Sequence, residues 1–137
     1  MTRYVLGFAF DDTGEKVVLI KKTKPAWQAG RYNGVGGKVE PFEGYMDAMA
    51  REFREETGLG WEAWTYFGKM TGDCWECACY HVFENYVIQN VTTTTDEEVG
   101  TFSVQALPAT ISNIPWLIAA ARNHRDKGDF QIEVKYA

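Results

Sequence analysis

Short stretches of alternating apolar and polar residues recur along the chain, and this two-residue period predicts β-strands. Strands are expected at residues 3–10, 16–22, 33–38, 61–69, 99–104 and 130–136, and residues 73–89 predict one long strand or two short ones. Asp11 to Gly14 are turn residues, so the first two strands are expected to form a hairpin. Residues 92–98 are expected to form a polar loop.

Two other segments repeat apolar residues at three- and four-residue spacing, the pattern of an amphipathic helix. The first begins near Tyr45 and stops at Gly58, a residue type that favours helix ends. The second covers about residues 114–127 and stops at Gly128, and Asn113 is suited to capping its start. The apolar faces are formed by Met46, Met49, Ala50 and Phe53 in the first helix and by Leu117, Ile118 and Ala121 in the second.

The order of these elements predicts the fold class. Strands come first, then a helix, more strands, a second helix and a final strand. This order favours a mixed β-sheet flanked by helices, an α+β fold arranged as an α/β/α sandwich. The 137 residues contain no repeat, low-complexity tract or linker, so we expect one domain over residues 1–137.

Composition narrows the classes of function. A hydrophobic content of 45% with 15% aromatic residues is typical of a globular domain. The net charge of −5 argues against a nucleic-acid polymer as partner, because such partners favour a basic surface. No apolar run approaches the ~20 residues of a membrane span, and no signal peptide is evident, so we expect a cytoplasmic protein with no membrane partner.

Three cysteines, Cys74, Cys77 and Cys79, are clustered. They suggest a zinc site, for which His81 is the near candidate as a fourth ligand, but the segment has the pattern of a strand. On a strand Cys77 and Cys79 face one way and Cys74 faces roughly the other. Ordinary reduced cysteines, partly buried, are the favoured interpretation.

The first helix carries three glutamates on one side. Glu52, Glu55 and Glu56 have the spacing i, i+3 and i+4, so they project together. Their carboxylates repel one another unless a cation joins them, and Mg²⁺ takes oxygen ligands of this kind. The alternative is a solvated acidic face, eased by Arg51 and Arg54.

The segment from Gly37 to Leu59 has a longer pattern: Gly, five residues, Glu, seven residues, Arg-Glu, an apolar residue, any residue, Glu-Glu, any residue, Gly and an apolar residue. The matching positions are Gly37, Glu43, Arg51, Glu52, Phe53, Glu55, Glu56, Gly58 and Leu59. This pattern resembles the Nudix hydrolase box, with no fixed position missing. The resemblance implies the Nudix fold and the hydrolysis of a phosphoanhydride bond in a nucleoside diphosphate derivative, with Mg²⁺ or Mn²⁺ as cofactor.

The resemblance also implies roles for individual residues. The metal ligands would be the carbonyl of Gly37 and the carboxylates of Glu52, Glu55 and Glu56. Arg51 would pair with Glu43 or with one of the helix acids, and Glu43 would steady the loop. Glu97, in preference to Glu98, would add an acid from a later loop, and the alternative is that it is an exposed side chain. Lys38 would contact phosphate or, alternatively, would be a solvated lysine.

Residues 29–38 resemble the corresponding segment of Nudix enzymes that cleave oxidised purine nucleoside triphosphates. There Asn33 would recognise the base, although Asn33 with Gly34 could equally form a turn. Asn113 and Trp116 would lie near the base, or Trp116 would belong to the core. We therefore expect a nucleotide substrate, a nucleoside triphosphate cleaved to monophosphate and pyrophosphate. The alternatives are cleavage of ADP-ribose or a dinucleoside polyphosphate, and a non-catalytic nucleotide-binding module.

Overall fold

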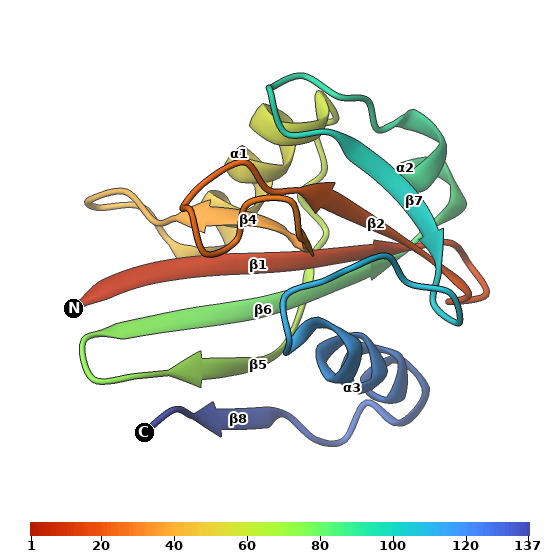
Figure 1. The fold of residues 1–137 in the computed structure, drawn as a ribbon. Helices are drawn as coiled ribbons and strands as arrows, with labels where there is room; N and C mark the ends of the chain where they lie inside the picture. Colours follow the sequence, from red (N-terminus) through yellow and green to blue (C-terminus); the bar gives the residue numbers. More distant parts are fainter.

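An eight-stranded mixed β-sheet runs through the computed structural model, which describes residues 1–137 (Figure 1). The strands are β1 (Thr2–Phe10), β2 (Lys16–Lys21), β3 (Tyr32–Asn33), β4 (Val35–Lys38), β5 (Thr65–Thr71), β6 (Trp75–Phe83), β7 (Val99–Ser103) and β8 (Ile132–Lys135). The helices are α1 (Tyr45–Thr57), α2 (Asn85–Asn90) and α3 (Ile114–Lys127). The predicted α+β class, a mixed sheet flanked by helices, is confirmed.

The long strand β1 lies at the centre of this sheet. The main path of strands is β3-β2-β1-β6-β5-β8, with β4 paired to β1 and β7 paired to β2. Strand β1 runs parallel to β6 from the pair Thr2↔Trp75 to the pair Phe10↔Phe83. On its other edge β1 pairs with β4 along residues 4–7 and with β2 only at Phe10↔Val17. The predicted hairpin is therefore present but short, because β4 occupies the rest of that edge.

The sheet separates two hydrophobic cores, and the alternation along β1 supplies both. Leu6, Phe8 and Phe10 pack in the core beneath α3, whereas Val5 and Ala9 pack in the core beneath α1. Burial of successive residues on opposite faces follows from the two-residue period of a strand. The core residues of α3 include Ile114, Leu117, Ile118 and Ala121, and those of α1 are Ala48, Met49 and Phe53. The prediction that Met46 belongs to the apolar face of α1 was wrong, because this side chain is 46% exposed near the start of the helix.

Two of the strand predictions were wrong in part. Residues 61–64 are irregular rather than extended, because the Trp64 indole donates to the Trp61 carbonyl at 2.9 Å and its ring packs edge-on against Phe53. Residues 85–90 form α2 instead of continuing the strand, because β6 ends level with its partner β1. There Asn85 and Asp12 exchange hydrogen bonds between backbone and side chain, which turn the chain.

The helix ends follow the prediction. Gly58 and Gly128 have φ values of 78° and 69°, and each N–H closes the last turn of its helix. Asn113 lies at the start of α3, but its side chain makes no capping bond, contrary to prediction. No helix in the structure is long and apolar enough to cross a bilayer. All three cysteines are free thiols, with Cys77 and Cys79 buried and Cys74 exposed, as predicted.

Candidate active site

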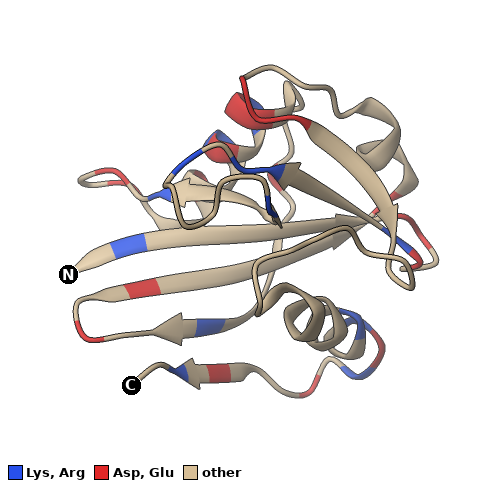
Figure 2. Ribbon diagram, viewed as in Figure 1, with Lys and Arg blue, Asp and Glu red and all other residues tan.

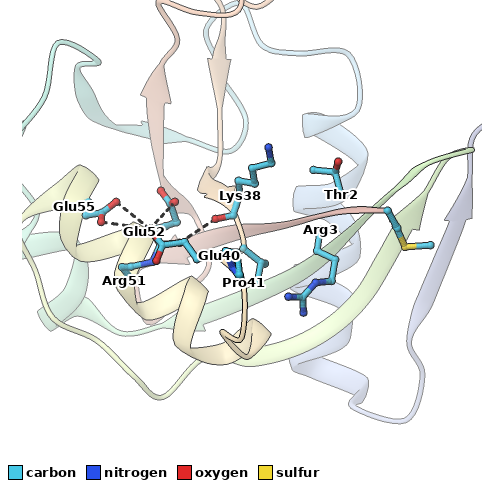
Figure 3. Close-up of a pocket in the computed structure, with 10 residues that line it drawn as sticks. Thr2, Arg3, Lys38, Glu40, Pro41, Arg51, Glu52 and Glu55 are labelled. Carbon is cyan, nitrogen blue, oxygen red and sulfur yellow. Dashed lines mark hydrogen bonds and ion pairs between the residues drawn. The ribbon is translucent and has the colours of Figure 1, made fainter.

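Arg51, on α1, joins the acidic residues of this region into one network (Figure 3). Its guanidinium donates to both carboxylate oxygens of Glu43, through Nε at 2.7 Å and Nη2 at 3.0 Å. Nη1 donates to Glu52 Oε1 at 3.0 Å and to Glu55 Oε2 at 3.2 Å, and Nη2 also donates to the Lys38 carbonyl at 2.9 Å. The predicted ion pair with Glu43 is therefore present, with the two-pronged geometry that favours arginine over lysine.

Glu43 holds the turn that precedes α1. Its Oε1 accepts from the Glu40 N–H at 3.0 Å, and its own N–H donates to the Glu40 carbonyl at 3.1 Å. The hydrogen bond from Arg51 lowers the pKa of Glu43, so its carboxylate stays ionised. Inside this turn Phe42 has a φ of 64° and a fully exposed ring. Glu43 therefore has the structural position expected, and Phe42 adopts a backbone conformation that disfavours side chains.

Glu52 is the most deeply buried acid of α1, with 9% exposure. Its carboxylate lies against the backbone of Gly37, where a Cβ would be only 2.5 Å from the Glu52 Cδ atom. Only glycine leaves room for this approach. Burial raises the pKa of Glu52, with Glu55 and Glu56 adding to the rise, while Arg51 opposes it. The residue is thus an anion held in a partly desolvated position beside β4.

Glu56 and Glu97 form a second acidic pair, on the side of α1 that faces the segment before β7. Figure 2 shows acidic residues on α1 and on the segment before β7, with basic residues after β2 beside them. Glu97 is 4% exposed and accepts from Lys22 Nζ at 2.9 Å and from the Thr23 N–H at 2.7 Å. Burial alone would raise the pKa of Glu97, but the hydrogen bonds from Thr23 and Lys22 outweigh it and lower the pKa. Burial, followed by repulsion from Glu97, raises the pKa of Glu56.

Consecutive threonines fix the loop that carries Glu97. The Thr92 and Thr94 hydroxyls donate to the carbonyls of Thr57 and Glu55 at the end of α1, at 3.2 and 2.6 Å. The Thr95 hydroxyl donates to Glu56 Oε2 at 3.4 Å and accepts from the Glu97 N–H at 3.1 Å. The last carbonyls of a helix have no partner within the helix. The threonines satisfy two of them and so place Glu97 beside Glu56.

Glu52, Glu55 and Glu56 lie on consecutive turns of α1, but their carboxylates do not converge as the prediction that they project together implied. No three His, Cys, Asp or Glu side chains in the structure are close enough to form a metal-binding group. Instead Arg51 bonds Glu52 and Glu55, Glu56 faces Thr95, and Lys22 bonds Glu97. The donors are nonetheless oxygens only, as Mg²⁺ and Mn²⁺ prefer. The open backbone at Gly37 fits a divalent cation at this position, as do the raised pKa values of Glu52 and Glu56, which burial causes first and neighbouring carboxylates increase.

Two cavities open beside this acidic region. The first, here called the carboxylate cavity, measures about 650 Å³ and is lined by Arg3, Lys38, Arg51, Glu52 and Glu55 among others (Figure 3). The second, called the aromatic cavity, measures about 670 Å³ and is lined by Trp27, Asn33, Trp75, Asn113 and Tyr136 among others. Lys22, Gly36 and Gly37 also line the aromatic cavity. The aromatic cavity therefore reaches Gly37 of β4, and the carboxylate cavity reaches the next residue, Lys38, although consecutive strand residues face opposite sides of a sheet.

The structure brings together two of the three predicted base-contacting residues. Asn33 and Asn113 both line the aromatic cavity, although they are far apart in sequence. Asn33 Oδ1 accepts from the Gly34 N–H at 2.8 Å, and Asn33 Nδ2 donates to Gln28 Oε1 at 3.3 Å, so the turn and the cavity wall share this side chain. Trp116 neither lines the cavity nor belongs to the core, since it is 42% exposed. It points away because the buried positions 114, 117 and 118 occupy the opposite side of α3.

Sequence reasoning missed several residues of the site. These are Trp27, Trp75 and Tyr136, which form aromatic walls of the cavity. Trp27 carried a usable signal, because a large aromatic in a loop six residues before Asn33 has no periodic apolar face to join. Trp75 and Tyr136 lie at the ends of strands, and only the pairing of the sheet brings them together.

Comparison with known proteins gives consistent results. The family model described as NUDIX domain matches residues 1–121. A CTP pyrophosphohydrolase of Escherichia coli is 43% identical over 44 residues, which are 32% of this chain and 33% of that protein. The matched segments span a third or less of the length of the curated relatives.

Solved structures share the fold over most of the chain. A MutT protein from Bacillus halodurans superposes with a TM-score of 0.72 and 17% identity, covering 98% of this chain and 88% of that chain. An ADP-ribose pyrophosphatase from Streptococcus suis superposes with a TM-score of 0.71 and 14% identity, covering 98% of both chains. At these identities the likeness is one of fold.

Proposed function

The chain belongs to the NUDIX domain family, and we propose that it hydrolyses a nucleoside triphosphate to a nucleoside monophosphate and pyrophosphate. The observation that carries this proposal is that the aromatic cavity reaches Gly37 of β4, against which the Glu52 carboxylate lies. A nucleotide is an aromatic base joined to a polyanion, and the aromatic cavity is lined by Gly37, which lies beside Glu52, and by Lys22, which bonds Glu97. A base in the aromatic cavity would direct its phosphates toward β4.

Glu52, Glu56 and the Gly37 carbonyl are the groups that would hold Mg²⁺ or Mn²⁺, with Glu55 and Glu97 as further oxygen donors. When bound, such a cation neutralises charge on the phosphates and makes water a stronger nucleophile. In this assignment Arg51 keeps Glu52 oriented through its hydrogen bond at 3.0 Å. Burial raises the pKa of Glu52 and Glu56, which is the direction that strengthens a carboxylate as a general base.

Lys38 and Lys22 supply the positive charge of the proposed phosphate path. Lys38 follows Gly37 directly and lines the carboxylate cavity, and its side chain makes no ion pair in the structure. Lys22 lines the aromatic cavity while bonding Glu97 at 2.9 Å. A triphosphate lying along β4 would meet both ammonium groups. A lysine ammonium acts as a mobile point charge, unlike the planar guanidinium of arginine, which donates two hydrogen bonds in a fixed geometry.

Recognition of the base is assigned to Asn33 and Asn113. Each offers an amide, with a donor and an acceptor on one side chain, to a base edge in the aromatic cavity. An oxidised purine is our preferred base, and the relative that acts on CTP makes a pyrimidine the competing candidate. Asn33→Ala should lower turnover of purine triphosphates far more than that of pyrimidine ones. An equal loss on both would assign Asn33 to the turn alone.

The deciding experiment is product release across a panel of nucleotides, with and without Mg²⁺. The panel contains ordinary and oxidised purine triphosphates, CTP, ADP-ribose and a dinucleoside tetraphosphate, with products identified by chromatography. Cation-dependent release of pyrophosphate from one triphosphate supports the proposal. Faster cleavage of ADP-ribose or the dinucleotide would replace the substrate class, and tight binding without turnover of any compound would indicate a binding module.

A further inference from the structure

Tyr136 connects strand β8 to the wall of the aromatic cavity. Its hydroxyl accepts from Asn113 Nδ2 at 3.1 Å, and its ring packs on Trp75 with centroids 5.6 Å apart. The Tyr136 N–H donates to the Thr71 carbonyl at 2.8 Å, and β8 runs parallel to β5 at the edge of the sheet (Figure 1). The family model ends at residue 121, so β8 and Tyr136 lie outside the part of the chain that it describes.

The contacts of Asn113 favour one orientation of its amide, because the Met70 sulfur can only accept a hydrogen bond, whereas the Tyr136 hydroxyl can donate or accept. Nδ2 donates to the Tyr136 hydroxyl and lies 3.5 Å from Met70 Sδ, so both hydrogens of the NH₂ group have acceptors. The Tyr136 hydroxyl in turn faces the same sulfur, at 3.9 Å. Oδ1 is buried and has no hydrogen-bond partner. A buried acceptor without a donor costs about 1–3 kcal/mol, so the orientation leaves Oδ1 ready for a donor from a ligand.

We propose that Tyr136 is a positioning residue for nucleobase selection, which fixes Asn113 so that its carbonyl oxygen accepts from an N–H group of the base. The inference rests on the function proposed above. An amide that could turn freely would offer either its oxygen or its NH₂ group, and would not distinguish a donor edge from an acceptor edge. With Nδ2 held by Tyr136 and Met70, the Asn113 side chain selects for bases with a donor at that point.

The test combines Tyr136→Phe with Asn113→Asp. Removing the hydroxyl keeps the aromatic wall but releases Nδ2, so binding should weaken about fivefold, the factor that one neutral hydrogen bond contributes. A carboxylate presents an acceptor in either orientation, so Asn113→Asp provides a background in which the orientation of the side chain no longer matters, and its own affinity is the reference for the double variant. In the Asn113→Asp background Tyr136→Phe should then change affinity by less than about twofold. A wall residue that acts only through packing would give the same loss in both backgrounds.

Binding is measured with nucleoside monophosphates, by calorimetry and by the fluorescence of Trp27 and Trp75, which line the cavity. Tyr86→Phe is the matched control, because Tyr86 is 58% exposed on α2 and does not line this cavity. Kinetics on the chosen triphosphate should show the loss in KM with kcat unchanged. Thermal unfolding should show less than about 2 °C of change for Tyr136→Phe, which separates positioning from folding.

Each outcome bears on the inference. A fivefold loss that disappears in the Asn113→Asp background supports it. An equal loss in both backgrounds, or no loss in either, overturns it while leaving the proposed function intact. If the wild-type protein binds no nucleoside monophosphate and cleaves no triphosphate, both the proposed function and this inference fail.

Discussion

Replacing Arg51 with methionine tests whether the guanidinium network organises the site. Methionine keeps most of the aliphatic stem but removes every donor. The change breaks two bonds to Glu43, one to Glu52, one to the Lys38 carbonyl and the contacts with Glu55. The Arg51 side chain is 23% exposed and those of Glu43 and Glu52 are 15% and 12% exposed, so solvent screens these bonds only in part.

The magnitude follows from those contacts. A hydrogen bond to a charged group contributes about 1.5–3 kcal/mol when shielded, and exposed pairs contribute much less. Glu55 is 56% exposed and adds little. Counting the fork to Glu43 and the bond to Glu52, with a discount for partial exposure, gives a loss of about 3 kcal/mol. For a chain of this length that corresponds to a fall in Tm of about 10 °C.

The loss should depend on pH in a defined direction. Arg51 lowers the pKa of Glu43 below its ordinary value of 4.5, so this stabilisation is present above pH 4.5 and is lost as the pH falls through the native pKa. Removing Arg51 also leaves Glu52 as a buried anion without a cation, and protonation in acid relieves that penalty. The gap between wild type and variant should therefore be widest near neutral pH and should narrow in acid.

The assay is urea unfolding at pH 7 and at pH 4, with Arg54→Met as the matched control. Arg54 lies on the same helix, is exposed and makes no ion pair, so its loss should stay below about 1 kcal/mol at both pH values. Equal losses for the two arginines would refute the network as a source of stability. A gap that widened in acid would refute the assignment of that stability to ionised glutamates.

Three further changes test single contacts. Glu56→Gln should lower turnover at least a hundredfold without unfolding the chain. It should also raise Tm at pH 7 but not at pH 4, because an acid whose native pKa is raised destabilises the fold once it is ionised. Glu62→Gln in an exposed loop is the control, and near-normal turnover of Glu56→Gln would exclude Glu56 from the reaction. Gly37→Ala should weaken Mn²⁺ binding, measured by EPR, at least tenfold, because the new Cβ would displace the Glu52 carboxylate, whereas Gly44→Ala, where the nearest atom is 3.7 Å away, should bind as wild type. Phe42→Gly should raise Tm by about 2 °C, since φ is 64° and the exposed ring has no burial to lose, whereas Phe42→Ala keeps the strain and should show no rise.

Prediction from the sequence succeeded for features that depend on residues close together along the chain. The helix from Tyr45 to Gly58 combines apolar periodicity with a glycine that reaches a φ of 78°, and neither depends on distant parts of the chain. The pairing of Arg51 with Glu43 or a helix acid was implied by the resemblance to the Nudix box, and it too is local, because a turn followed by two helical turns brings positions eight apart into contact. Such features depend on local backbone geometry, so the spacing of residues along the sequence is enough to predict them.

The strand after residue 83 shows where that reasoning stops. Tyr86, Val87 and Ile88 are residue types that favour strands, and their pattern indicated extension. The structure makes them part of α2, because the partner strand β1 ends at Phe10 and Asp12 bonds Asn85 across 73 residues of sequence. The length of the partner strand therefore overrides local propensity, and nothing in residues 85–90 records that length.

The aromatic cavity could not be predicted for the same reason. Its walls come from a loop at Trp27, the first residue of β6, the start of α3 and the residue after β8. They meet because β1 pairs with β6, β6 with β5, and β5 with β8. A single sequence states the residues but not these three pairings.

The threonine loop shows how the fold can hold like charges together. Glu56 and Glu97 repel each other, as the raised pKa of Glu56 reflects, and without restraint the loop would move the two carboxylates apart. The Thr94 hydroxyl prevents this by satisfying the otherwise unpaired Glu55 carbonyl at 2.6 Å, a bond that has nothing to do with the acids themselves. Lys22 then neutralises Glu97 from the opposite side at 2.9 Å. The repulsion between Glu56 and Glu97 is therefore offset by the hydrogen bonds at the end of α1 and by the ion pair with Lys22.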